Sequence, residues 1–175
     1  RTARDFAERS LKPIASELDR TERFPKDILK SLADIGLMGV NVAAELGGAE
    51  AGAVAYALAM TEIARGCAST SVTMAVTNMV GEVIAAFGSP AQREKHVTKL
   101  TSGAYHAGSF ALSEPEAGSD PGAMRTVAKR RKLHVATLAA SVLSSATNHH
   151  DENTCVSPSF PNSSIRRAAA GYFSR

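Results

Sequence analysis

Apolar residues recur at helical spacing through the first hundred positions of this 175-residue chain, and short breaks divide them into separate segments. The first segment, from Arg1 to about Glu22, carries its apolar side chains three and four positions apart with charged residues between them. This spacing predicts an amphipathic helix. Pro13 predicts a bend within it, because proline lacks the amide that an interior helical position requires. A chain with several such segments must bury their apolar faces against one another.

Residues that start and stop helices mark further segments. The sequence predicts a second helix with Pro25 at its first position and Gly36 just past its end. The stretch that follows is a predicted loop, since it contains the pair Gly47-Gly48. Two alanine-rich helices are then predicted, over about 54–65 and 71–87, and their apolar character on all sides is typical of buried helices.

The clearest helix start is Ser89-Pro90-Ala91-Gln92, where Ser89 suits the cap and Gln92 suits the reciprocal bond of a capping box. This helix is predicted to end near Gly103. Five helices joined by short loops predict an all-α bundle.

After Gly103 the pattern changes. The apolar run Ser109 to Leu112 predicts a short strand, and a dense cluster of turn-forming residues follows it. We therefore expect a mostly α chain with an N-terminal helical domain over 1–104 and the truncated start of a β-domain over 105–128. Residues 129–175 are rich in Ser and Asn, and we interpret them as a disordered or out-of-frame tail.

The turn cluster brings backbone amides, hydroxyls and carboxylates close together. The small residues Ala117, Gly118 and Ser119 would let a flat or extended ligand approach the main chain. A surface loop in which Asp120-Pro121-Gly122 makes a simple turn explains the same residues, and spacing alone favours that interpretation.

A resemblance to a known family favours the ligand-binding interpretation over the simple surface loop. The segment FALSEPEAGSDPGA resembles the signature of the acyl-CoA dehydrogenase family, in order and at every defined position. Upstream, RDFAERSLKPIASELDRTERFP, LADIGLMGVNVAAELGG and YALAMTEIARGCASTS resemble the family's helical N-terminal domain. The resemblance covers residues 1 to about 128.

What the resemblance implies about the site is specific. Phe110, Ala111, Leu112 and Ser113 would bind FAD, and Ser119 would contact the bound acyl-CoA. The family's reaction is α,β-dehydrogenation of an acyl-CoA thioester to the trans-2-enoyl-CoA, with reduced flavin reoxidised by an electron-transferring flavoprotein. Relatives of full length form homo-oligomers, either tetramers or dimers.

The resemblance assigns no catalytic base to this chain. In the family, a glutamate from a second helical domain removes the α-proton, and a tryptophan-bearing strand contacts the flavin, whereas this sequence contains no Trp. The resemblance gives neither Glu114 nor Glu116 that role. We therefore expect a truncated chain that is inactive alone.

Two other classes of function stay open. The chain could serve as a non-catalytic helical fragment that binds other subunits, or belong to a related acyl-CoA oxidase or flavin monooxygenase. The Ser-Glu-Pro and Gly-Ser-Asp elements favour the dehydrogenase branch.

Charge and composition argue against other partners. The formal net charge is only +3, and the charged residues are scattered along the chain, which disfavours binding of nucleic acid. We interpret the basic run Lys129 to Lys132 as solvated charge. No uninterrupted apolar run reaches the ~20 residues that cross a bilayer, and no targeting segment is visible. We expect the bacterial cytoplasm or the mitochondrial matrix.

Neither a disulfide nor a metal site is predicted. Cys67 and Cys155 lie in unlike regions, and neither belongs to a CxxC pair. His149-His150-Asp151-Glu152 has no diagnostic ligand spacing, so a solvated polar run is the better interpretation.

Overall fold

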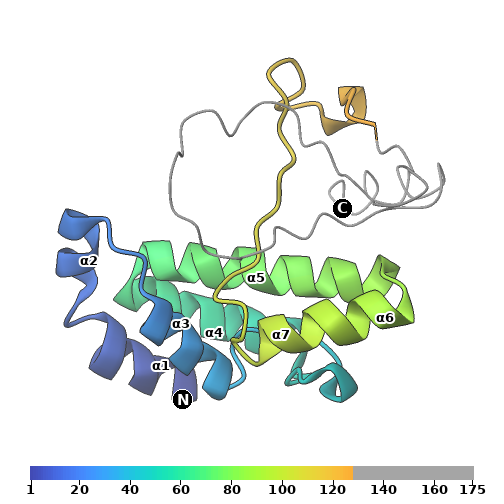
Figure 1. Ribbon diagram of the computed structural model, residues 1–175. Helices are drawn as coiled ribbons and strands as arrows, with labels where there is room; N and C mark the ends of the chain where they lie inside the picture. The colour runs from blue at the N-terminus through green and yellow to red at the C-terminus, as the bar shows by residue number, and fades with distance from the viewer. Residues whose placement is uncertain (128–175) are drawn as a thin grey trace. The chain divides into compact units, whose positions relative to one another are not determined.

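The computed structural model describes residues 1–127, which divide into one compact unit over Arg1–Ser109 and a second that begins at Phe110 (Figure 1). The predictions of a tail over 129–175, of solvated charge at Lys129 to Lys132 and of a polar run at His149 to Glu152 lie outside the described residues. The predicted boundary between 104 and 105 stays a prediction.

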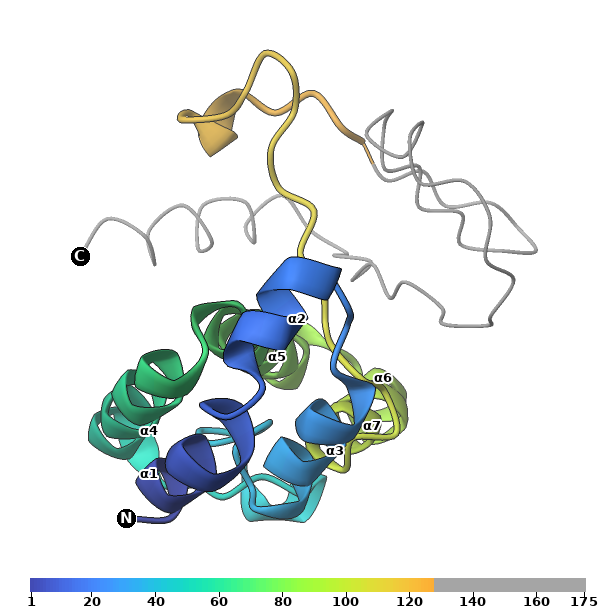
Figure 2. The ribbon, with the colours of Figure 1, turned by 90° about the vertical axis from the view of Figure 1, so that its left-hand side faces the viewer.

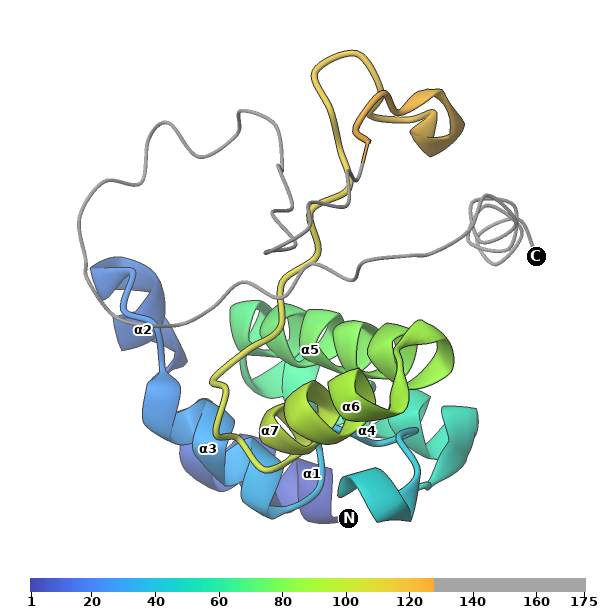
Figure 3. The same cartoon turned by 45° about the vertical axis from the view of Figure 1, so that its right-hand side comes forward.

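The first unit is helical, as predicted. Its regular elements, including short π and 3-10 segments, are α1 (Thr2–Phe6), η1 (Ala7–Leu11), α2 (Ala15–Thr21), α3 (Lys26–Asp34), η2 (Ala44–Leu46), α4 (Gly52–Gly66), α5 (Ala68–Phe87), α6 (Pro90–Gln92), η3 (Arg93–Val97) and α7 (Thr98–Thr101). The helices α6 and α7, with η3 between them, run beside α5 (Figure 3).

Most helix ends follow the predicted signals, but α3 begins at Lys26, so Pro25 lies at its N-cap and not at the first helical position. The first helix is interrupted around Pro13, and α1 and α2 become separate elements. Ser89 accepts from the Gln92 amide, and the Gln92 side chain accepts from the Ser89 amide, which completes the predicted capping box. The break predicted between the two alanine-rich helices shrinks to Cys67, whose backbone is extended.

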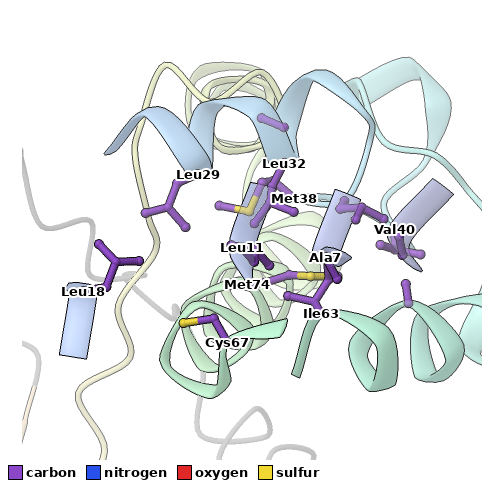
Figure 4. Packing of buried hydrophobic residues seen from close by; sticks show 14 residues of the cluster. Ala7, Leu11, Leu18, Leu29, Leu32, Met38, Val40, Ile63, Cys67 and Met74 are labelled. Atoms are coloured by element: carbon purple, nitrogen blue, oxygen red, sulfur yellow. The ribbon is translucent and has the colours of Figure 1, made fainter. Parts of the chain in front are cut away.

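The core of the helical unit lies where α1, η1, α3, α4 and α5 meet, and Figure 2 shows these helices surrounding it. Its largest fully buried apolar side chains come from four helices, η1, α3, α4 and α5, and from the loop after α3: Leu11, Leu29, Leu32, Met38, Ile63 and Met74. Figure 4 shows them converging on one another. Burial of apolar area at this meeting point is the main source of the unit's stability.

The prediction that both alanine-rich helices are buried is wrong for α4 and holds only in part for α5, where Val72 is 61% exposed. In α4, Ala59 and Ile63 are buried, but Val54 and Leu58 are 75% and 65% exposed. A helix packed on α1, η1 and α5 buries only the face toward them, whatever the composition of its other face.

By length and composition, α5 could cross a membrane, yet 44% of its most apolar window is buried inside the protein. Its buried face also contains polar side chains, those of Thr70, Ser71, Thr77 and Asn78. The apolar composition of α5 is therefore explained by its packing against the other helices of the bundle.

The second unit contains little regular structure in its described part, residues 110–127. It holds an isolated antiparallel bridge between Glu114 and Ala117 and the 3-10 turn η4 (Pro121–Ala123). The strand predicted at Ser109 to Leu112 is not formed: within residues 1–127 the structure contains no strand, and a strand needs a second strand to form a ladder of backbone hydrogen bonds.

Candidate functional site

The helical unit fixes the chain just before the candidate site. The buried hydroxyl of Thr77 on α5 accepts from the Gly108 amide at 3.0 Å and donates to the carbonyl of Thr73 at 2.7 Å. A Cβ on Gly108 would come within 2.9 Å of the Val80 Cβ, so the main chain lies directly against α5. The candidate segment begins two residues later, at Phe110.

The four predicted flavin-contacting residues follow one another in the second unit. Phe110 is 37% exposed, Ala111 and Ser113 are exposed, and Leu112 is half-buried. The Phe110 ring and the Ser113 hydroxyl are accordingly accessible to a ligand in this unit.

Ser119, the predicted acyl-CoA contact, is also exposed and follows a glycine with open surroundings. A Cβ on Gly118 would meet no atom within 4 Å. The next residue, Asp120, accepts from the Gly122 amide at 3.1 Å and starts the turn η4. The main chain around Ser119 is therefore open while its C-terminal end is held by a local turn.

One interaction joins the two ends of this segment. The Glu114 carboxylate accepts from the Arg125 and Thr126 amides, one on each oxygen, both at 2.8 Å. The amide of Arg125, the largest cause, and the contacts with Thr126 lower the pKa of the Glu114 carboxyl. The main chain of Glu114 also bonds that of Ala117, which is buried.

The sequence carries no signal for this closure. Both donors are main-chain amides, and Arg125 and Thr126 lie beyond the signature, so their identities carry no signal for it. What the sequence did indicate is a carboxylate at Glu114, directly after Ser113.

No group of three or more His, Cys, Asp or Glu side chains within residues 1–127 is placed to hold a metal ion. The candidate site in the described residues consists of apolar side chains, hydroxyls, carboxylates and main-chain groups.

Comparison with known proteins identifies the helical unit. The family model for the acyl-CoA dehydrogenase N-terminal domain matches residues 1–104. The chain belongs to the acyl-CoA dehydrogenase family. The predicted family and its helical N-terminal fold are thus confirmed.

Individual acyl-CoA dehydrogenases agree with this assignment. The mitochondrial short-chain specific acyl-CoA dehydrogenase of Sus scrofa is 48% identical over 130 residues, which cover 73% of this chain and 31% of that protein. A glutaryl-CoA dehydrogenase from Mycobacterium smegmatis in complex with FADH2 is 30% identical with a TM-score of 0.70, covering 75% of this chain and 34% of that one. This chain spans about a third of the length of both relatives.

A further structural match comes from the electron transferring flavoprotein of Acidaminococcus fermentans. One chain of that structure is 27% identical with a TM-score of 0.69, covering 74% of this chain and 34% of that chain. The similarity thus covers about three quarters of the present sequence, as it does for the other two relatives.

Proposed function

We propose that this chain supplies one wall of the flavin and acyl-CoA site of an FAD-dependent acyl-CoA dehydrogenase. In this proposal Phe110, Ala111, Leu112 and Ser113 face the flavin, and Ser119 faces the acyl-CoA. The observation that carries it is the family signature, which lies directly after a helical domain of that family and leaves both serines exposed.

The residues present suit these ligands chemically. The partly exposed ring of Phe110 offers an apolar surface to an aromatic ring system. The Ser113 hydroxyl can donate to or accept from the polar edge of a flavin. The open main chain at Gly118 allows close approach by an extended acyl thioester, which a larger side chain would hinder.

The chemistry divides between cofactor and protein. When bound, FAD accepts the hydride that leaves the β-carbon while a base removes the α-proton. Phe110 and Leu112 exclude water from their side of the site, and Ser113 and Ser119 orient the two ligands. No residue of this sequence is assigned as the base, so we propose that the 175 residues alone do not turn over an acyl-CoA.

We extend the proposal to the partners that the family uses. Reduced flavin would be reoxidised by an electron-transferring flavoprotein, and full assemblies would be homo-oligomers. Support comes from the family assignment and from the FADH2 complex of a relative. The mitochondrial relative and the bacterial one are consistent with either compartment named above.

Binding of FAD tests the proposal. The full chain is titrated with FAD and then with butyryl-CoA, and flavin absorbance and fluorescence are recorded. Ser113→Ala should weaken FAD binding and Ser119→Ala should weaken butyryl-CoA binding, whereas Ser102→Ala, an exposed serine of the helical unit, should change neither. An unaltered chain that binds neither ligand would contradict the proposal, and turnover of butyryl-CoA with an artificial electron acceptor would contradict the inactivity.

A second function is favoured by the exposed face of α4. Val54 and Leu58 lie one helical turn apart and are mostly exposed, which suits a helical fragment that binds other subunits without catalysis. Mixing the chain with a full-length relative distinguishes the two functions. Mixed oligomers in which this chain binds no flavin are expected only under the second function.

A further inference from the structure

The segment 114–126 is closed on itself by one side chain. Glu114 bonds Ala117 through its main chain, at 3.1 and 3.4 Å, and the amides of Arg125 and Thr126 through its carboxylate, both at 2.8 Å. In Figure 1 this part of the chain, drawn in yellow and orange, turns back on itself before the short turn η4. Glu114 therefore lies where the two ends of the segment meet.

The position of Glu114 in the sequence gives this closure a consequence for the site. Ser113, the proposed flavin contact, is its immediate neighbour, and Ser119, the proposed acyl-CoA contact, lies inside the closed segment. Between Ser119 and the closing amides, the Asp120 turn leaves the chain few conformations. Closure by Glu114 thus limits how far Ser119 can move from Ser113.

A second carboxylate in the segment cannot replace this closure. Glu116 pairs with the Arg125 guanidinium at 2.9 Å, but the two side chains are 72% and 82% exposed, and ion pairs so exposed contribute little. The hydrogen bonds of the Glu114 carboxylate are exposed too, but there are two of them, and both come from main-chain amides. The carboxylate therefore holds the backbone itself and not a flexible side chain.

We propose that Glu114 is a positioning residue of the acyl-CoA site, which holds Ser119 in register with Ser113 by closing the segment 114–126. The inference rests on the proposed function for its ligands. The closure is a property of the chain alone. Loss of the carboxylate frees the Arg125 and Thr126 amides and lets Ser119 move away from its contact.

Glu114→Gln and Glu116→Gln form a matched pair for the test. Each replaces a carboxylate by an amide of the same size within one segment, but only the first removes an acceptor from a main-chain amide. Hydrogen exchange of the Arg125 and Thr126 amides reports the closure. Titration with FAD and butyryl-CoA reports the site, and thermal unfolding of the helical unit reports the rest of the chain.

We expect Glu114→Gln to speed exchange at Arg125 and Thr126 by about tenfold and to weaken butyryl-CoA binding by a similar factor, with helical unfolding unchanged. Glu116→Gln should leave exchange and binding within about twofold of the unaltered chain. Equal exchange in the unaltered chain and Glu114→Gln, or equal effects of both variants, would overturn the proposal.

Failure of the proposed function looks different. If the unaltered chain binds neither FAD nor butyryl-CoA, the role of Glu114 toward a ligand is overturned together with that function. The closure is then tested only by the hydrogen-exchange rates of the Arg125 and Thr126 amides.

Discussion

The side-chain amide of Asn78 donates to the main-chain carbonyl of Leu37 at 2.8 Å, across 41 positions of the sequence. The same side chain accepts from the Val40 amide at 2.7 Å and donates to the Met74 carbonyl at 2.9 Å. Asn78 is fully buried, so one residue of α5 holds the loop that follows α3. Buried polar groups of this kind are costly to leave without partners.

We expect Asn78→Leu to lower the free energy of unfolding by about 3 kcal/mol, because the Val40 amide and the Leu37 carbonyl would stay buried without partners. Urea unfolding followed by circular dichroism measures the loss. Asn41→Leu is the control. The side chain of Asn41 donates to Glu82 from a partly buried position, and its side-chain oxygen Oδ1 has no hydrogen-bond partner in the described structure. The loss of unfolding free energy in Asn41→Leu should therefore stay below about 1 kcal/mol. Equal losses would contradict the role assigned to Asn78.

Two glycines that face Val42 should respond in opposite ways to alanine. A Cβ on Gly48 would lie 1.9 Å from the Val42 carbonyl oxygen, a backbone atom that cannot move aside. We expect Gly48→Ala to destabilise the chain by about 3 kcal/mol or more. A Cβ on Gly81 would lie 3.5 Å from Val42 Cγ2, an ordinary contact, so Gly81→Ala should be neutral or stabilise α5 by up to about 1 kcal/mol. Thermal unfolding of both variants checks this order, and the reverse order would contradict the packing of the loop.

Cys67 should react slowly in the folded chain, although its thiol is more acidic than usual. Burial raises the pKa of the Cys67 thiol, but hydrogen bonds with Ser69 and Thr70 outweigh burial, so the pKa lies below its ordinary value. Access decides the rate, because Cys67 is only 8% exposed.

In a Cys155→Ser background, iodoacetamide should therefore alkylate the unfolded chain at least about tenfold faster than the folded chain. Mass spectrometry of timed samples with and without urea gives the two rates. Similar rates would show that the N-terminal end of α5 opens readily in the folded protein.

Closure of the segment 114–126 should depend on pH in one direction. The Arg125 amide first, and the Thr126 contacts after it, hold the pKa of the Glu114 carboxyl below its usual range, so the folded state favours the carboxylate. A lowered folded-state pKa means that the closure is fully present above the unfolded-state pKa and is lost as the pH falls through the folded-state value.

The other charged side chains of the segment 114–126 are Glu116, Asp120 and Arg125, and the positive charge of Arg125 also lowers the pKa of Glu114. We expect the Thr126 amide resonance to shift in NMR spectra only in the acidic range, below the ordinary pKa of a glutamate. In Glu114→Gln this shift should be absent. A shift that persists in the variant would contradict the role of Glu114 in this pH dependence.

Local signals were sufficient for most helix ends. Pro13 marks the interruption of the first helix, and the Ser89 capping box starts α6, because both act on the backbone within one turn of themselves. Gly36 and Gly103 follow α3 and α7 with positive φ, which glycine adopts at little cost. The exposure of Val54 and Leu58 on α4 was not predictable in this way, since it depends on which neighbours the helix has.

By itself, the sequence determined the helical bundle, its family and the segment that carries the candidate site, because helix periodicity, caps and a contiguous signature are all encoded within a few neighbouring residues. Only the tertiary structure decided that Asn78 holds the loop after α3 and that Glu114 closes the segment around Ser119. The partners in both cases are main-chain groups, which every residue possesses, so only the path of the folded chain can bring the right ones within hydrogen-bonding distance.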